Sequence, residues 1–219
     1  MEVYKLIFLE LFSGTKTMSE AFKRCGFAVY NVDNNPKLEP SLVADISILK
    51  YQDLVRECGD YPTVIWASPD CTKFSYASGN RNEFRKANTE PLSNSALNAL
   101  DLVKHTLKLI DELQPTYWFL ENPLHGALKD QDFMKEYMYM DVSYCRYGAK
   151  NQKPTRIWGN FPPSFRPKFA CHHIKHEVEF RNISGKKARA EIPIELGYDL
   201  AENCILDNGL QIMNLRDFI

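Results

Sequence analysis

Short apolar runs alternate with amphipathic segments along most of this chain, and that alternation limits the possible folds more than any other feature. The apolar runs have the length and composition of strands buried in a sheet, and the amphipathic segments repeat their apolar residues at helical spacings. An order of strand, helix, strand and helix with short connections predicts an α/β fold, in which helices cover both faces of a mostly parallel, twisted sheet. The expected strands are Lys5–Phe12, Phe27–Val32, Leu42–Ala44, Pro62–Ala67, Thr116–Leu120 and Met138–Tyr144. The expected helices are Thr17–Cys25, Tyr51–Cys58, Ser93–Leu113 and Asp130–Tyr137.

The composition is that of an ordinary globular domain, with 44% hydrophobic and 25% charged residues. No run of 18 apolar residues is present, so we expect no membrane-spanning helix, and the N-terminus lacks the pattern of a secretory signal. The six cysteines are scattered without a Cys-x-x-Cys pair, which favours free thiols in a reducing compartment. We therefore expect an intracellular protein that does not bind membranes.

Positive charge is concentrated in one stretch of the chain. Residues 142–190 contain 11 Lys and Arg but only 2 Asp and Glu, whereas the net charge of the whole chain is −1. Such a stretch is typical of a face that binds nucleic acid or phosphate. A solvated basic loop explains the same count equally well, so charge alone leaves both interpretations open.

Polar residues follow four of the expected strands at the points where the strands end. They are the turn Ser13-Gly14-Thr15, then Asp33, the stretch Pro69–Cys71, and Glu121-Asn122. Ligands of open α/β sheets bind beyond the carboxyl ends of the strands, so we expect one site at this edge. Asp33 lies 19 residues after Gly14, about the spacing at which an acidic residue reaches ribose hydroxyls. A plain turn without a ligand is the alternative for this pair.

Cys71 is the strongest candidate for a nucleophile among the cysteines. It lies in a turn after a buried strand, Pro69 restricts its direction, and Lys73 lies near it in sequence. The alternative is an ordinary free thiol. Glu121 is either an exposed carboxylate or an acid whose pKa is raised by an apolar setting. The polar segment 72–91 is long for a loop inside a domain, which predicts a mobile functional loop.

Taken in order, these segments resemble the motifs of the DNA cytosine-C5 methyltransferases, in the short form often encoded by bacteriophages. The resemblance covers nearly the whole chain and implies the Rossmann-like fold of methyltransferases that use S-adenosylmethionine. The matching segments are LELFSGTKTMSEAF (Leu9–Phe22), NVDNNP (Asn31–Pro36), ADI (Ala44–Ile46), ASPDCTKFS (Ala67–Ser75), WFLENP (Trp118–Pro123), YGAKNQKPTRIWGN (Tyr147–Asn160) and AEIPIELGYDLA (Ala190–Ala201).

The resemblance implies a role for particular residues. Cys71 is the implied nucleophile toward a flipped-out cytosine, and Glu121 is the implied acid at the N3 and amino edge of the base. Asn122 would orient Glu121 or hold the loop, and either Lys153 or Arg156 would take the family's arginine role. The implied cofactor is S-adenosylmethionine. The residues implied to bind it are Phe12, Ser13, Gly14, Thr15, Lys16, Thr17, Asp33, Asn34, Asp45, Ile46, Ser68 and Pro69.

Two departures from the family pattern bear on activity. Lys16 and Thr17 stand where the family has Gly-Gly, and a lysine there could pair with the cofactor carboxylate or crowd it. Asp70 stands where the family has a second proline, and an anion beside Cys71 disfavours the thiolate. Because of these departures, the alternative is a weak or inactive member of the family that binds cofactor or DNA. A methyltransferase acting on RNA or on a free cytosine nucleotide is a further alternative. A dinucleotide oxidoreductase is disfavoured because Gly-x-Gly-x-x-Gly is absent.

The resemblance also implies a division of the chain. Residues 1–158 and 190–219 would form the catalytic domain, and residues 159–189 a reduced target-recognition lobe. We expect duplex DNA that contains cytosine as the partner, with loose sequence specificity and salt-sensitive binding. We further expect a monomer in the cytoplasm of a bacterial host, encoded by a phage.

A small cluster of cysteine and histidine lies inside the expected lobe, at Cys171, His172, His173 and His176. These residue types bind zinc, but directly adjacent ligands suit a closed tetrahedral site poorly. We therefore favour a polar loop here and predict no metal.

Overall fold

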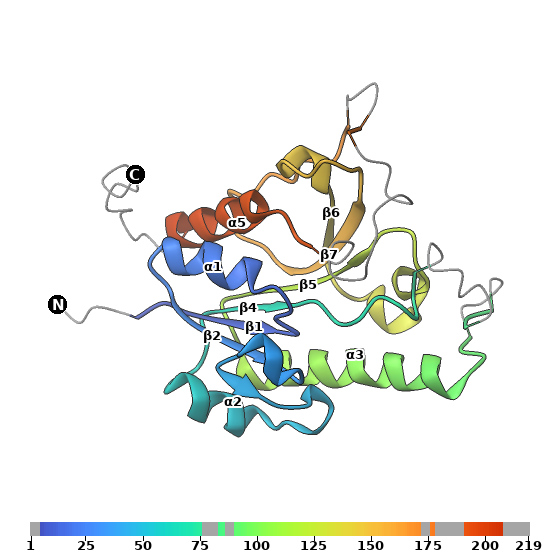
Figure 1. Cartoon of the computed structure of the whole chain (residues 1–219), viewed down its shortest axis with the longest axis horizontal. Coiled ribbons are helices and arrows are strands. Elements are labelled where there is room, and N and C mark those ends of the chain that lie inside the picture. The colour runs from blue at the N-terminus through green and yellow to red at the C-terminus, as the bar shows by residue number, and fades with distance from the viewer. Residues whose placement is uncertain (1–4, 76–82, 86–89, 172–175, 178–190, 208–219) are drawn as a thin grey trace.

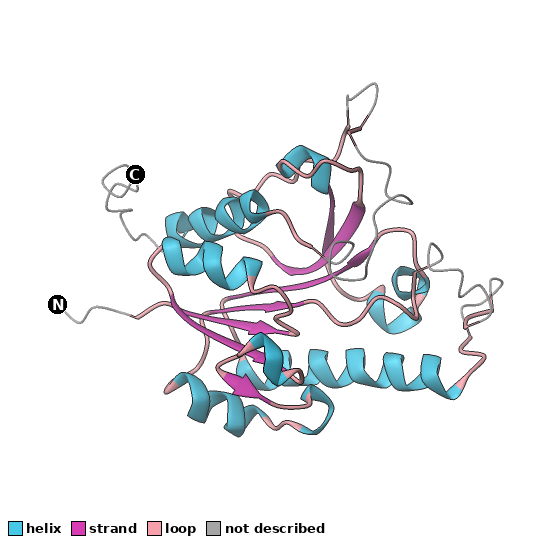
Figure 2. Cartoon of the chain, viewed as in Figure 1, coloured by secondary structure: helices cyan, strands magenta, loops and turns pink. Residues whose placement is uncertain are grey.

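The computed structural model describes residues 5–75, 83–85, 90–171, 176–177 and 191–207. Its centre is a seven-stranded sheet in the order β3-β2-β1-β4-β5-β7-β6, with helices on both faces (Figures 1 and 2). This architecture confirms the expected α/β fold. The strands are β1 Ile7–Leu11, β2 Ala28–Asp33, β3 Leu42–Val43, β4 Val64–Ala67, β5 Tyr117–Pro123, β6 Tyr139–Ser143 and β7 Pro154–Asn160. The longer helices are α1 Thr17–Arg24, α2 Tyr51–Cys58, α3 Asn94–Leu113 and α5 Ile194–Asp207.

The two faces of the sheet carry separate apolar clusters. Successive side chains of a strand point to opposite faces, so Leu9 and Leu11 pack on one side and Phe8 on the other. The cluster around Leu9 includes residues of α2 and α3, whereas the cluster around Phe8 includes residues of α1 and α5. Figure 1 shows these two helix pairs on opposite sides of the sheet. Both faces are therefore covered, as the unbroken apolar runs predicted.

Strands β3, β2, β1, β4 and β5 run parallel, and β7 and β6 complete the sheet in the antiparallel direction. β7 was not among the strands expected from the sequence, because it begins at Pro154 and contains Gly159. That glycine lies opposite Phe119 in β5, and a Cβ atom there would fall 1.9 Å from the carbonyl oxygen of Trp118. Only glycine lets the two strands approach this closely.

The chain between β5 and β6 corrects one expectation. The predicted helix at 130–137 is absent, and two short 3-10 turns, η4 Ala127–Asp130 and η5 Asp132–Met134, take its place. Gln131 between them has extended backbone angles (φ −71°, ψ 136°), which interrupts any continuous helix. Tyr137 packs edge-on against Trp118, with 5.5 Å between the ring centroids. Packing on the sheet therefore outweighs the helical pattern of this segment.

Part of the expected recognition lobe belongs to the core. Phe161 and Phe165 are buried, and the Phe161 ring lies 5.4 Å from that of Phe119 in β5. Residues 172–175 and 178–189 of the expected lobe lie outside the described residues. None of the described helices is long and apolar enough to cross a membrane.

Candidate active site

Three of the polar strand ends meet at one edge of the sheet. Leu11 at the end of β1 pairs with Ala67 at the end of β4, and Ala67 pairs with Leu120 in β5. Ser13-Gly14 and Ser68–Cys71 therefore leave the sheet beside Glu121-Asn122, which continue β5 and pair there with β7. This is the edge at which open α/β sheets bind ligands.

Cys71 lies in a turn that hydrogen bonds fix on both sides. Its carbonyl oxygen accepts hydrogen bonds from the backbone N–H groups of Phe74 (3.0 Å) and Ser75 (2.9 Å). The Asp70 carboxylate accepts a hydrogen bond from the backbone N–H of Thr72 at 2.8 Å and another from the Thr72 hydroxyl. The Asn122 amide donates to the carbonyl oxygen of Pro69 at 3.2 Å, which joins this turn to the end of β5.

The thiol of Cys71 lies in a setting that disfavours the thiolate. Burial raises its pKa to about 11, and the negative charges of Glu121 and Asp70 act in the same direction. Lys153 acts in the opposite direction and lowers the pKa. Lys73, which the sequence suggested as the nearby cation, instead forms an ion pair with Glu83 at 2.9 Å.

Glu121 and Lys153 form a buried pair beside Cys71. The Lys153 Nζ lies 3.8 Å from the Glu121 Oε1, and each residue is only 6% exposed. The same Oε1 accepts no hydrogen bond from any described residue. Lys153 Nζ also lies 4.7 Å from the ring centroid of Tyr144, whose pKa is raised well above its ordinary value by burial and by Glu121. The pair therefore keeps a buried acceptor available beside the thiol.

Arg156 lies away from this cluster. Its guanidinium makes two hydrogen bonds to Asp141, at 2.7 and 2.8 Å, and lies over the Tyr139 ring at 3.6 Å. Arg156 is paired with Asn122 across β5 and β7, whereas Glu121 is paired with Ile157, so the side chains of Arg156 and Glu121 point to opposite faces of the sheet. Of the two basic candidates, the structure brings Lys153 and not Arg156 to Cys71 and Glu121.

The turn between β1 and α1 is tightly wound. Phe12, Gly14 and Lys16 have positive φ values of 61°, 49° and 59°. The backbone N–H of Gly14 donates to the Asp33 carboxylate at 3.0 Å, which ties the ends of β1 and β2 together. The hydroxyl of Ser13 is buried and has no hydrogen-bond partner among the described residues. The turn thus carries an unsatisfied polar atom at the edge where a ligand would lie.

The residues that depart from the family pattern have local partners. Lys16 Nζ donates to the carbonyl oxygen of Glu39 at 2.5 Å, so this lysine spans toward the connection between β2 and β3. The hydroxyls of Thr15 and Thr17 are 3.0 Å apart. Because the Lys16 amine binds the carbonyl oxygen of Glu39, its positive charge lies away from the turn in which the family has glycines.

The remaining candidates for the cofactor surround this turn. The Asp45 carboxylate accepts hydrogen bonds from the backbone N–H (2.9 Å) and hydroxyl (2.8 Å) of Ser47, and these bonds lower its pKa. Ile46, the next residue, is buried in the core, whereas Asn34 is exposed. The Ser68 hydroxyl accepts a hydrogen bond from the Trp66 indole at 2.6 Å, and Pro69 is buried.

Two residues near the site were not among the candidates from the sequence. Glu10 is buried in β1, accepts a hydrogen bond from the Ser19 N–H at 2.9 Å, and has a pKa raised to about 7, first by burial. Tyr144 is the other, since its buried ring contacts Lys153. A signal for Glu10 existed, because it is the one charged residue of β1, whose other residues are apolar. No pattern marked Tyr144.

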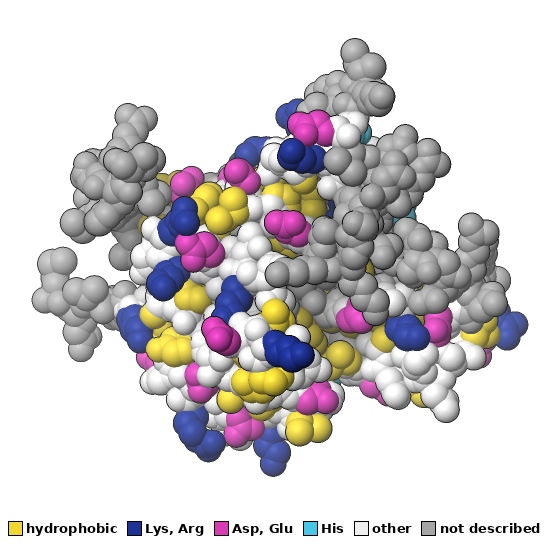
Figure 3. Space-filling view, viewed as in Figure 1, with side chains coloured by type: hydrophobic (Ala, Val, Ile, Leu, Met, Phe, Trp, Pro, Cys, Tyr) yellow, Lys and Arg dark blue, Asp and Glu magenta, His cyan; other side chains and the backbone are white. Residues whose placement is uncertain are grey.

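The basic stretch 142–190 is partly neutralised in the structure. Among its described members, Lys150, Lys153, Arg156 and Lys168 each lie within 4 Å of a carboxylate, those of Glu177, Glu121, Asp141 and Asp199 respectively. On the face drawn in Figure 3, Lys and Arg side chains are interspersed with Asp and Glu instead of forming one patch. The described residues therefore do not present a continuous basic surface on that face.

Comparison with known proteins supports the fold and points to a family. No protein-family model matches the chain. The chain is 27% identical over 205 residues to the "Probable DNA (cytosine-5)-methyltransferase" of Frog virus 3 (isolate Goorha), and the match covers 86% of each chain.

Two solved structures share the fold. One is described as a "putative DNA modification methyltransferase encoded within prophage" of E. coli, with a TM-score of 0.53, 18% identity, and coverage of 75% of this chain and 51% of that chain. The other is a methyltransferase of Entamoeba histolytica, with a TM-score of 0.51, 13% identity, and coverage of 77% of this chain and 58% of that chain. This chain thus spans little more than half the length of either solved protein. The sheet order and the antiparallel β7 are those of the α/β methyltransferase fold.

Proposed function

We infer that this chain is a member of the cytosine-C5 methyltransferase family, and we propose that it transfers a methyl group from S-adenosylmethionine to C5 of cytosine in DNA. The observation that carries the proposal is the buried Glu121 oxygen without a hydrogen-bond donor among the described residues, beside Cys71 and Lys153. A buried acceptor left without a donor costs about 1–3 kcal/mol, so a bound ligand that donates to it would explain why the fold retains it. The amino group of cytosine is such a donor.

The residue types fit the chemistry that this transfer needs. Cytosine C5 is a poor nucleophile, and addition of the Cys71 thiolate at C6 makes C5 electron-rich enough to accept a methyl cation equivalent. Glu121 would hold the amino edge of the base, take the proton that the Cys71 thiol loses, and pass it to N3 as the C6–S bond forms. When bound, S-adenosylmethionine supplies a methyl group on a positively charged sulfur. Loss of the C5 proton to a base then lets the C6–S bond break, which releases the Cys71 thiolate, and the proton on N3 returns to Glu121.

Lys153 has a defined place in this scheme. Its ammonium lowers the pKa of Cys71 and lies 3.8 Å from Glu121, so it stabilises both negative groups of the site. It would also lie near the carbonyl side of a base that Glu121 holds by the amino edge. We therefore assign the family's basic role to Lys153 and a structural role to Arg156.

The β1–α1 turn has features that suit the cofactor. The unsatisfied hydroxyl of Ser13 and the compact turn at Gly14 lie at the N-terminus of α1, and Asp33 lies at the adjacent strand end. We propose that this turn holds the methionine part, that Asp33 binds the ribose, and that Asp45 with Ile46 meets the adenine. Asp33 would exchange its hydrogen bond from Gly14 for the ribose hydroxyls or share it with them.

Two observations support DNA as the substrate: the name of the relative from Frog virus 3 and the chemistry of the base. The target atoms of cytosine lie inside the duplex stack, so the nucleotide would be flipped out before Cys71 could reach C6. Residues 142–190 would contact phosphates through the basic residues that are not paired with carboxylates. We propose that the short recognition segment lies in the part of residues 159–189 that follows the buried Phe165.

Transfer of a labelled methyl group tests the proposal directly. Wild-type protein is incubated with methyl-labelled S-adenosylmethionine and, in separate reactions, with duplex DNA, RNA or deoxycytidine monophosphate. We expect label in DNA as 5-methylcytosine, and a loss on the order of 10³-fold or more in Cys71→Ser. Cys25→Ser, which changes a partly buried thiol outside the site, should keep wild-type activity.

The other outcomes are also informative. Label in RNA or in the nucleotide but not in DNA would replace the proposed substrate while keeping the chemistry. Absence of transfer to all three acceptors by a folded protein that binds S-adenosylmethionine would favour the inactive member. That second candidate rests on the pKa of Cys71, which burial, Glu121 and Asp70 raise to about 11.

A further inference from the structure

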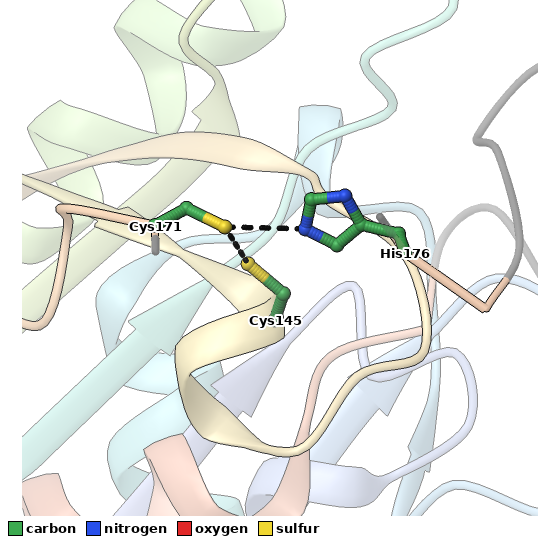
Figure 4. Close-up of side chains that lie close together, drawn as sticks. All are labelled: Cys145, Cys171 and His176. Atoms are coloured by element: carbon green, nitrogen blue, oxygen red, sulfur yellow. Dashed lines mark hydrogen bonds between the residues drawn. The ribbon is translucent and has the colours of Figure 1, made fainter. Parts of the chain in front are cut away.

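Two cysteines and one histidine converge outside the candidate active site. Cys145 lies in the 3-10 turn η6 Tyr144–Tyr147, and Cys171 and His176 lie beyond β7. The Cys145 and Cys171 Sγ atoms are 3.5 Å apart, and the Cys171 Sγ is 3.2 Å from the His176 Nε2. All three potential ligand atoms lie within 4.8 Å of one another. Figure 4 shows the three side chains pointing toward a common point.

Backbone contacts bring Cys171 to this position. The N–H of Ser143 donates to the carbonyl oxygen of Lys168 at 3.0 Å, and the N–H of Lys168 donates to the Tyr147 hydroxyl at 3.1 Å. The segment that ends at Cys171 is therefore attached to the chain on both sides of Cys145. Cys145 is 7% exposed, and Cys171 and His176 are partly buried. The convergence thus depends on hydrogen-bonded backbone as well as on side-chain rotamers.

We propose that Cys145, Cys171 and His176 bind a Zn²⁺ ion. Two thiolates and an imidazole are ligands that zinc prefers, and the Cys-x₄-His spacing of Cys171 and His176 lies in the range common in zinc sites. Zinc at about 2.3 Å from sulfur and about 2.0 Å from nitrogen would separate two sulfurs by about 3.8 Å and sulfur from nitrogen by about 3.5 Å in a tetrahedron. The Cys145–Cys171 and Cys171–His176 separations of 3.5 and 3.2 Å are only a few tenths of an ångström shorter, so a small opening between these pairs admits the ion.

The surroundings of the cluster suit a metal better than a disulfide. A disulfide requires the sulfurs to approach to about 2.05 Å, and it would give the histidine no role. The Ser143 hydroxyl, which is buried, lies 3.3 Å from the Cys145 Sγ and can donate to a thiolate there. Such a hydrogen bond to a ligand sulfur is typical of metal centres. A water molecule can fill the fourth position. His172 and His173 lie outside the described residues and are not needed.

The ion would join two parts of the chain that lie side by side at this point. One is η6, which also carries Tyr144 of the active-site cluster, and the other is the beginning of the segment 172–190. Zinc would therefore fix the root of that segment at a set distance from Lys153 and Glu121. The proposal does not depend on methyl transfer and is tested without it.

Metal analysis of the full chain tests the site. Protein purified in the presence of a reductant is loaded with Zn²⁺, passed through a desalting column, and analysed for metal. We expect about one zinc per chain, falling to less than about a tenth in Cys145→Ser and Cys171→Ser. Cys25→Ser is the matched control and should keep its zinc. His176→Ala should lose the ion, whereas His176→Cys should keep it because thiolate replaces imidazole as a ligand.

Binding of Co²⁺ is a second measurement of the site, and it uses only the wild-type protein. Wild-type protein loaded with Co²⁺ should show the near-ultraviolet absorption of thiolate-to-cobalt charge transfer, and stoichiometric Zn²⁺ should remove it. Absence of that absorption, or of bound zinc in the wild type, would overturn the proposal. So would an equal loss of zinc from Cys25→Ser, or a Cys145–Cys171 disulfide as the main form of the reduced preparation.

Discussion

At the level of single residues, the protonation of Cys71 governs the proposed chemistry. Burial first, then Glu121 and Asp70, raise the pKa of this thiol to about 11, and Lys153 opposes them. Only the thiolate attacks, so below pH 11 the reactive fraction rises by about tenfold for each pH unit. The free protein should therefore react faster as the pH rises from 7 to 10. Asp70 is the one contributor that can be changed without removing a residue assigned to the base.

Asp70→Asn should increase the reactivity of Cys71. Asparagine can keep the hydrogen bonds to Thr72 and removes the charge, so the pKa of Cys71 should fall and its alkylation rate at pH 8 should rise about threefold. Stopped alkylation followed by peptide mass analysis measures the rate at Cys71 alone. An unchanged rate would mean that solvent screens Asp70 from the thiol.

The ionisation of Glu10 should make the free energy of unfolding depend on pH. Its pKa rises from 4.5 to about 7 on folding, because burial favours the neutral acid. The stabilisation from this group is therefore fully present below pH 4.5 and is lost as the pH rises toward 7. Glu10→Gln lacks the ionisation, so the wild type should lose about 2–3 kcal/mol relative to the variant between pH 5 and pH 8. Urea unfolding of both proteins at the two pH values measures this difference, and parallel pH profiles would contradict it.

At the level of elements, the pairing of β5 with β7 positions Glu121 and Lys153. The approach of these strands depends on Gly159, where a Cβ atom would fall 1.9 Å from the Trp118 carbonyl oxygen. Gly159→Ala should therefore destabilise the fold by more than about 3 kcal/mol, since backbone must move to relieve the clash.

A second glycine is a control for this prediction. Gly26 has a φ of 90° but nothing within 4 Å of an added Cβ atom, so Gly26→Ala tests backbone strain without a clash. We expect a cost of about 1 to 2 kcal/mol there. Denaturant unfolding compares the two variants. Equal losses in both would show that the β5–β7 approach is not tight.

The sequence predicted the elements that local pattern determines. The helix at Tyr51–Cys58 has the expected limits, and Ser93 caps α3 through the Ala96 N–H at 3.0 Å as its position suggested. The parallel strands were found because apolar runs mark them directly. The strand β7 was missed because Pro154 and Gly159 are poor strand residues whose fit depends on β5. The predicted helix at 130–137 failed for a related reason, since aromatic packing on the sheet replaced local propensity.

The candidate site shows the same division. The strand-end rule located Cys71, Glu121 and Asn122 from sequence alone, because parallel strands end at one edge. The choice between Lys153 and Arg156 required the register of β7, which sequence pattern did not provide. The local Cys-His cluster raised the possibility of zinc, but its adjacent ligands disfavoured a site, and the contact between Cys145 and Cys171 spans 26 residues and is not visible in the local pattern. Contacts between residues that are far apart in the sequence therefore decide the questions that local sequence pattern leaves open.

At the level of the whole molecule, charge predicts how DNA binding responds to salt. The stretch 142–190 has 11 basic residues, and four of them are paired with carboxylates in the structure. These four ion pairs leave at most seven residues for phosphate contacts, which at about 0.9 counterions released per contact gives a slope of log Kd against log salt no steeper than about 6. Titrations of labelled duplex DNA at several salt concentrations measure the slope. A slope near 10 would mean that the ion pairs open on binding.

A covalent trap tests the central claim, that Cys71 attacks C6 of cytosine in DNA. Fluorine at C5 cannot leave as a cation, so duplex DNA with 5-fluorocytosine should hold the protein as a stable adduct after methyl transfer. Wild-type protein with S-adenosylmethionine should form this adduct at Cys71, as mapped by peptide mass analysis, and Cys25→Ala should form it equally well. Cys71→Ala should form none. An adduct at another residue, or none from a wild type that methylates DNA, would contradict the account.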